Sequence, residues 1–152
     1  MKEISFSAPD ITANDISKVR DVIKSGWLVH GKYSFHLENL FCDLTRAKFA
    51  TTVSNCTAGL HLSCIAAGFG VGDEVIVPAQ THVATAHAVE YTGARVVFVD
   101  VDPITGNITV EEMKKKLTDA TKGVIPVHMA GYPCNMPAIA TLCEENNLVL
   151  IE

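Results

Sequence analysis

The fold class can be inferred from two short runs, EVIVP at positions 74–78 and RVVFVD at positions 95–100. A helical segment at about 82–92 separates them. Both short runs are almost continuously apolar, which is typical of parallel strands that are covered by helices on both faces. A strand, a helix and a second strand of these lengths form a right-handed βαβ unit. This stretch therefore predicts an α/β fold with a mostly parallel sheet.

The same alternation continues on both sides of this unit. Further strands are predicted at residues 50–54, 123–128 and 148–151. Further helices are predicted at about residues 57–67, 110–118 and 136–146. Thr109 and Glu112 have the spacing of a capping box, and Gly93 has the position of a C-terminal cap.

Residues 1–48 have a different pattern, with two helices and a loop. A capping box of Thr12 and Asp15 starts the first helix, and Ser25-Gly26 ends it. The second helix carries apolar residues at positions 37, 40, 41 and 44, which is helical spacing. The loop between them holds Trp27, the only tryptophan. We therefore divide the chain into an N-terminal helical segment, 1–48, and the first part of an α/β domain, 49–152.

Composition excludes several classes of protein. The chain has 152 residues with 12 Lys plus Arg against 17 Asp plus Glu, and its net charge of −5 argues against a nucleic-acid-binding protein. No stretch approaches the roughly 20 apolar residues of a membrane span. Residues 1–10 lack the layout of a signal peptide, so a cytoplasmic location is expected.

The cysteines and histidines do not predict a metal site. Five cysteines form no C-x-x-C pair, which favours reduced thiols. His61 and Cys64 share a helix face, but no second pair completes a zinc site. His82 and His87 are five positions apart, roughly 140° around a helix, and would not share a metal.

Two junctions between strands and helices are candidate ligand sites, because helix N-termini at strand ends bind anions. The first is Ser54-Asn55-Cys56-Thr57-Ala58-Gly59, which could hold a phosphate or could simply cap its helix. The second contains His82, whose ring could stack on a planar ligand or could be a solvated side chain.

Two other motifs have simpler interpretations. The glycines at positions 68, 70 and 72 follow a helix and precede a strand, the reverse of a dinucleotide-binding motif, and indicate a helix exit. Asp100 and Asp102 could be catalytic, but residues 102–107 have the composition of a turn, which we favour.

Taken together, these junctions resemble the DegT/DnrJ/StrS family of sugar aminotransferases, which depend on pyridoxal 5′-phosphate (PLP). The resemblance covers nearly the whole chain. It is carried by GWL at 26–28 with Gly31, SNCTA at 54–58, GDEVIVP at 72–78, THVAT at 81–85, YTGA at 91–94, FVDVDP at 98–103, and IPVH at 125–128 with Gly131.

The resemblance implies the large domain of a type I PLP-dependent transferase and a set of site residues. Thr57 and Ala58 would hold the cofactor phosphate through backbone N–H groups, beside Cys56, which replaces the family's usual glycine. His82 would stack on the pyridine ring, and Trp27 would lie near the substrate. The implied reaction moves an amino group, typically from glutamate, to a nucleotide-linked keto sugar, in a homodimer.

PLP chemistry also needs a Schiff-base lysine and an acidic partner for the pyridine nitrogen. In the family both would follow Glu152, and strand 148–151 has no helix after it, so we expect the chain to be the front part of a longer one and to be inactive alone. No catalytic residue is assigned within it. Two alternatives stay open: a sugar dehydratase of the same family, with histidine in place of the lysine, and a non-catalytic cofactor-binding fragment.

Overall fold

The computed structural model describes residues 8–152. The prediction that no signal peptide is present rests largely on residues outside this range. The chain divides into two compact units after Thr52. We call residues 8–52 the N-terminal unit and residues 53–152 the C-terminal unit, and describe each by itself.

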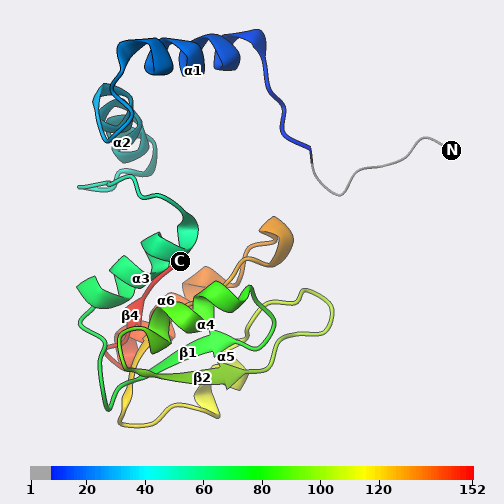
Figure 1. The fold of residues 1–152 in the computed structure, drawn as a ribbon. Coiled ribbons are helices and arrows are strands. Elements are labelled where there is room, and N and C mark those ends of the chain that lie inside the picture. The colour runs from blue at the N-terminus through cyan, green and yellow to red at the C-terminus, as the bar shows by residue number, and fades with distance from the viewer. Residues whose placement is uncertain (1–7) are drawn as a thin grey trace, which may run out of the picture. The chain divides into compact units, whose positions relative to one another are not determined.

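The N-terminal unit contains two helices, α1 (Ala13–Ser25) and α2 (Lys32–Thr45) (Figure 1). The capping box at the start of α1 is confirmed: the Thr12 N–H donates to Asp15 Oδ2 at 2.8 Å, and the Asp15 N–H donates to Thr12 Oγ1 at 3.3 Å. Gly26 ends α1 with a φ of 71°, a left-handed conformation that glycine adopts without strain. Neither helix has a buried residue.

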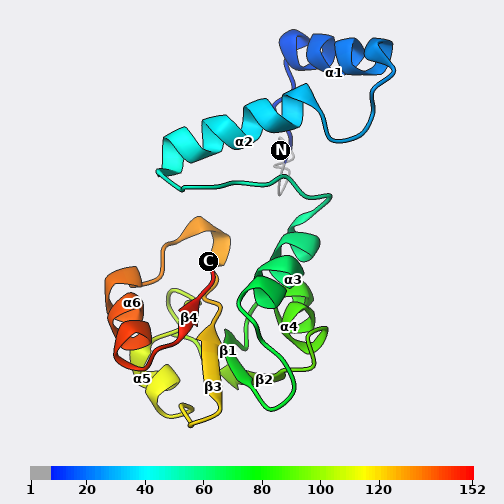
Figure 2. The ribbon, with the colours of Figure 1, turned by 90° about the vertical axis from the view of Figure 1, so that its left-hand side faces the viewer.

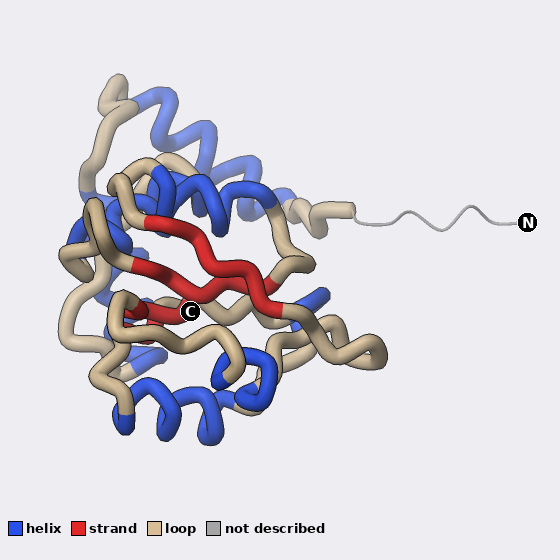
Figure 3. The backbone as a smooth tube through the Cα atoms, turned by 90° about the horizontal axis from the view of Figure 1, so that it is seen from below, coloured by secondary structure: helices blue, strands red, loops and turns tan. Residues whose placement is uncertain are grey.

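The C-terminal unit is built on a four-stranded parallel sheet, seen as red segments between helices in Figure 3. The strand order is β2-β1-β3-β4. The strands are β1 (Glu74–Pro78), β2 (Arg95–Val99), β3 (Thr121–Val124) and β4 (Val149–Leu150). All three pairings are parallel, which confirms the predicted α/β fold.

Helices cover both faces of the sheet, as predicted (Figure 2). On one face Val75 and Val77 pack in a core with Cys64 and Val89 from α3 and α4. On the other face Ile76 packs in a second core with residues of α5 and α6. The helices are α3 (Cys56–Ala66), α4 (Val83–Glu90), α5 (Val110–Lys114) and α6 (Met136–Glu145), with a short 3-10 helix at Met129–Gly131. Successive side chains of β1 point to opposite faces of the sheet, and both faces are covered, which explains why residues 75–78 are all apolar.

The predicted strand at residues 50–54 is wrong, because these residues belong to no strand. The Thr52 N–H donates to the side chain of Glu38 at 2.7 Å instead of to a neighbouring strand. The alternation of residues is compatible with extended backbone, but a strand also needs a pairing partner. The strand β1 is consequently the first of the described sheet.

Other predicted boundaries differ by a few residues. The strand predicted at 123–128 ends at Val124, although the Ile125 N–H still donates to the Ile76 carbonyl at 2.9 Å. The helix predicted at 110–118 ends at Lys114, where a turn begins. Within residues 8–152, no helix is long and apolar enough to cross a membrane.

Candidate functional site

A pocket of about 490 Å³ lies where β3 and β4 end and α3 and α4 begin. Its volume is in the usual range for small-molecule sites. It is lined by Cys56, Thr57, Leu60, Thr81, His82, Ala84, Thr85, Ile125, Pro126, Val127, His128 and Glu152. Three of the four residues predicted to bind a cofactor, Cys56, Thr57 and His82, therefore share one pocket.

The beginning of α3 forms one side of this pocket. Asn55 is the N-cap, and its side-chain oxygen accepts the Ala58 N–H at 2.9 Å. Cys56 and Thr57 are the first two residues of the helix, so their N–H groups have no acceptor within it. The helix dipole adds a partial positive charge there, which favours an anion. Ala58, the fourth predicted residue, is not among the lining residues, and its N–H is engaged by the cap.

His82 forms the neighbouring side of the pocket as the N-cap of α4. Its Nδ1 accepts the Ala84 N–H at 3.1 Å. A neutral His82 ring consequently carries its proton on Nε2. The capping bond holds the imidazole in one orientation, while the side chain stays exposed. The ring is thus oriented in advance for contact with a ligand.

His128 and Glu152 form a third side that sequence reasoning missed. His128 Nδ1 accepts the Cys134 N–H at 3.1 Å, so its Nε2–H faces Glu152 Oε2 at 3.0 Å. The signal for these residues was present: His128 is the last residue of one predicted parallel strand and Glu152 directly follows another, and the carboxyl ends of such strands share one edge. The pair places a carboxylate and an imidazole on the same pocket.

Trp27 lies in the N-terminal unit, within the loop between α1 and α2. Its side chain is 62% exposed, and its Nε1 donates to the His30 carbonyl at 2.9 Å. The indole therefore has its polar atom satisfied and most of its surface free for a partner.

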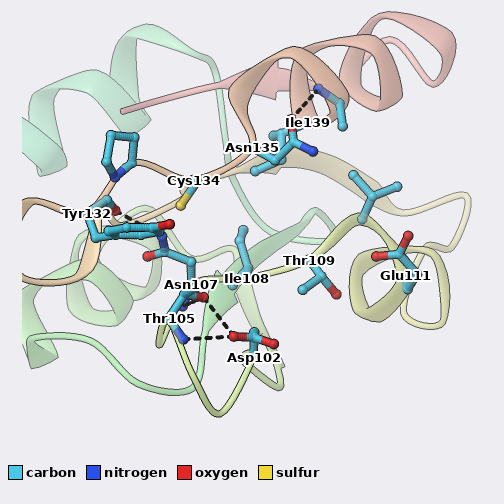
Figure 4. A pocket seen from close by; sticks show the side chains of 13 residues that line it. Asp102, Thr105, Asn107, Ile108, Thr109, Glu111, Tyr132, Cys134, Asn135 and Ile139 are labelled. Carbon is cyan, nitrogen blue, oxygen red and sulfur yellow. Dashed lines mark hydrogen bonds between the residues drawn. The ribbon is translucent and has the colours of Figure 1, made fainter.

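A second pocket, of about 360 Å³, lies between the loop after β2 and the segment before α6 (Figure 4). It contains Asp102, whose Oδ1 accepts the N–H of Ile104 at 3.0 Å and the N–H of Thr105 at 2.7 Å. The Thr105 N–H is the main cause that lowers the pKa of Asp102. These bonds are those of the predicted turn, which is confirmed, and they give Asp102 a structural role.

In the part of the chain that the structure describes, no three His, Cys, Asp or Glu residues are grouped so as to hold a metal ion. Cys64 is fully buried, and the His61 ring lies 5.3 Å from the Tyr91 ring. All five cysteines are free. Burial raises the pKa of the Cys64, Cys134 and Cys143 thiols.

Comparison with known proteins gives consistent matches. The chain is 40% identical, over 153 residues, to GDP-perosamine synthase of Escherichia coli O157:H7. The aligned region covers 100% of the chain and 42% of that protein. The structure of an aminotransferase from Psychrobacter cryohalolentis matches with a TM-score of 0.91 and 38% identity. The match covers 97% of the present chain and 38% of the chain of that aminotransferase. The chain thus spans less than half the length of these relatives.

A third match is a GDP-4-keto-6-deoxymannose-3-dehydratase, solved with a trapped PLP-glutamate geminal diamine. Its TM-score is 0.91 at 28% identity, and the match covers 99% of the present chain and 40% of the dehydratase chain. The family model described as the DegT/DnrJ/EryC1/StrS aminotransferase family matches residues 9–152. The predicted family is confirmed: the chain belongs to the DegT/DnrJ/EryC1/StrS aminotransferases.

Proposed function

We propose that this chain forms the part of a PLP-dependent aminotransferase that holds the cofactor phosphate and ring, and that the enzyme transfers an amino group from glutamate to a nucleotide-linked keto sugar. One observation carries the proposal. The N-terminus of α3, with Cys56 and Thr57, and the imidazole of His82 line a single pocket at one edge of the parallel sheet.

The beginning of α3 suits the phosphate of PLP. The N–H groups of Cys56 and Thr57 and the Thr57 hydroxyl supply donors, and the helix dipole adds to the attraction. The Ala58 N–H joins them when the Asn55 side chain, its present acceptor, turns away. The replacement of the cap by an anion is an exchange of acceptors, so no buried donor is left unpaired.

The remainder of the pocket suits the pyridine ring. His82 offers a flat face held by its capping bond, and the lining of the pocket also includes the apolar residues Leu60, Ala84, Ile125 and Val127. When bound, PLP supplies the electron sink for amino-group transfer. The chain's own residues bind the phosphate, orient the ring and exclude water from one of its faces.

The substrate side and the assembly follow from the family resemblance. We propose that Trp27 packs its exposed indole against the sugar nucleotide and that two copies of the whole protein form a homodimer. The exposed indole face, with Nε1 already bonded to His30, supports the contact with a flat or sugar-like partner. A cytoplasmic location fits an enzyme with five free thiols.

A sugar dehydratase is the second candidate, supported by the close structural match to the GDP-4-keto-6-deoxymannose-3-dehydratase. The two activities are distinguished by product analysis of the whole protein with a GDP-linked keto sugar and glutamate. An amino sugar indicates transfer, and a deoxy sugar indicates dehydration.

We expect pyridoxamine phosphate to protect Cys56 from alkylation, because Cys56 is exposed beside the proposed phosphate site. This ligand has no aldehyde and so cannot react with surface lysines. Mass spectrometry after a short iodoacetamide pulse measures labelling at each cysteine. Cys42, partly exposed in the N-terminal unit, is the internal control. The buried thiols with raised pKa should label slowly.

Pyridoxamine without phosphate is the matched ligand control and should protect Cys56 far less. Equal labelling of Cys56 with and without pyridoxamine phosphate would contradict the phosphate site. Equal protection of Cys56 and Cys42 would indicate a nonspecific effect of the ligand and would contradict it as well.

Replacing His82 should weaken this protection modestly, since aromatic stacking is worth about 1 kcal/mol beyond burial, or about fivefold in affinity. His82→Asn retains a capping oxygen but lacks the aromatic ring, whereas His82→Phe retains a ring but lacks the cap acceptor. We expect His82→Asn to lose affinity and His82→Phe to keep it, measured by the ligand concentration that half-protects Cys56. The reverse order would show that His82 acts only as a helix cap.

A further inference from the structure

A hydrogen-bond network around Glu38 joins three parts of the N-terminal unit. One oxygen of Glu38, Oε1, lies 2.7 Å from the Thr52 N–H donor, 3.0 Å from the Thr52 hydroxyl and 2.9 Å from His30 Nε2. The Glu38 side chain is only 13% exposed. Through these bonds, α2 holds both the loop that precedes it and the segment that follows it.

His30 connects this network to Trp27. The Trp27 Nε1 donates to the His30 carbonyl at 2.9 Å. The indole also lies directly against Gly31, where an added Cβ would be 2.7 Å from the indole Cδ1. On its other side, the His30 ring lies edge-on to Phe35, with ring centroids 4.6 Å apart. The conformation of Trp27 therefore depends on where His30 is held.

Apolar packing within the unit does little to hold this loop. Neither α1 nor α2 has a buried residue, and Leu28 and Val29 of the loop are exposed. The hydrogen bond from His30, followed by that from the Thr52 N–H, lowers the pKa of Glu38. Glu38 is consequently a carboxylate at neutral pH, and its bonds are of the strong, charge-assisted kind.

We infer that Glu38 is a positioning residue. Through His30, it holds the Trp27 side chain in the conformation in which the indole contacts the substrate. The substrate part rests on the proposed function, in which Trp27 contacts a nucleotide-linked sugar. Glu38 itself acts at a distance, because its hydrogen bonds go to His30 and Thr52.

The single tryptophan makes this inference directly measurable in the chain as it is. Near-ultraviolet circular dichroism and fluorescence anisotropy both report how firmly the Trp27 indole is held. We expect Glu38→Ala to reduce the near-ultraviolet signal in the indole region and to lower the anisotropy. Gly31→Ala should have the same effect, since its methyl group collides with the indole while Glu38 is unchanged.

Asp43→Asn is the matched control. Asp43 is an exposed carboxylate on the same helix, so this variant removes one negative charge from α2 without touching the network. We expect it to keep the wild-type Trp27 signal. A Glu38→Ala variant with intact far-ultraviolet dichroism and a wild-type Trp27 signal would overturn the inference.

If Glu38→Ala loses its helices, a second variant tests the positioning role. His30→Ala leaves the bonds between Glu38 and Thr52 in place and cuts only the link to the loop. We expect it to lose the Trp27 signal while the far-ultraviolet spectrum stays unchanged. A wild-type Trp27 signal in His30→Ala would refute the positioning role.

Titration with GDP-mannose separates this inference from the proposed function. We expect the Trp27 emission of the wild-type chain to respond, with a higher half-saturating concentration for Glu38→Ala. The variants could lose the near-ultraviolet Trp27 signal while the Trp27 emission of the wild-type chain does not change on addition of GDP-mannose. In that case Glu38 does position Trp27, and the proposed substrate contact is wrong.

Discussion

Replacing Ile76 by alanine should lower the free energy of unfolding by about 2–5 kcal/mol. Ile76 is fully buried at the centre of β1, in the core that joins the sheet to α5 and α6. The substitution removes apolar contacts and leaves a cavity, because a packed core relaxes only partly. Urea unfolding followed by far-ultraviolet circular dichroism measures the change.

Ile104→Ala is the matched control for this prediction. The chemical change is the same, but Ile104 is 93% exposed in the turn after β2, so its effect should stay within about 0.5 kcal/mol. A similar loss of stability in both variants would mean that burial of the isoleucine side chain does not determine the decrease in the free energy of unfolding. It would also contradict the assignment of Ile76 to the core.

Gly123→Ala should destabilise the C-terminal unit by about 1–3 kcal/mol, although it adds only one methyl group. A Cβ at Gly123 would lie 2.2 Å from Phe69 Cζ and 3.1 Å from the Val149 carbonyl oxygen. Phe69 is buried, and Val149 belongs to the paired strand β4, so neither can move away freely. The methyl group therefore forces Phe69 out of its position or opens the pairing of β3 with β4.

Two further variants test the stated cause. In Gly59→Ala the new Cβ lies 3.5 Å from Val53 Cγ2, an ordinary contact, and alanine in a helix should stabilise α3 by about 0.5–1 kcal/mol. In the double variant Gly123→Ala with Phe69→Leu, the smaller side chain should recover part of the lost stability. A double variant whose loss equals the sum of the single losses would exclude Phe69 as the cause.

Local signals in the sequence were sufficient for most of the fold. Apolar runs such as that of β1, predicted at its observed bounds, report burial on both faces, and caps such as Thr12 with Asp15 involve residues three positions apart. Side-chain patterns at such short range are properties of the segment itself. The family resemblance used the same junctions, and the match over residues 9–152 confirms it.

Pairing between distant segments was not predictable in the same way. The segment at residues 50–54 has a composition compatible with a strand, yet Thr52 bonds to Glu38, 14 positions away. The end of β3 is another example, since β3 stops at Val124, opposite Leu150, the last residue of β4. A strand exists only when another strand accepts its hydrogen bonds.

Patterns along the chain predicted the α/β class and two candidate ligand sites at helix starts, and the family resemblance pointed to Cys56, Thr57 and His82 within them. Contacts between distant segments, which the folded chain alone reveals, bring these three residues into one pocket with His128 and Glu152. The folded chain also pairs the Ala58 N–H with the Asn55 side chain. It alone showed that Glu38 reaches Trp27 through His30. The physical reason is that composition and periodicity act along the chain, whereas a site depends on strand order and on contacts between residues far apart in it.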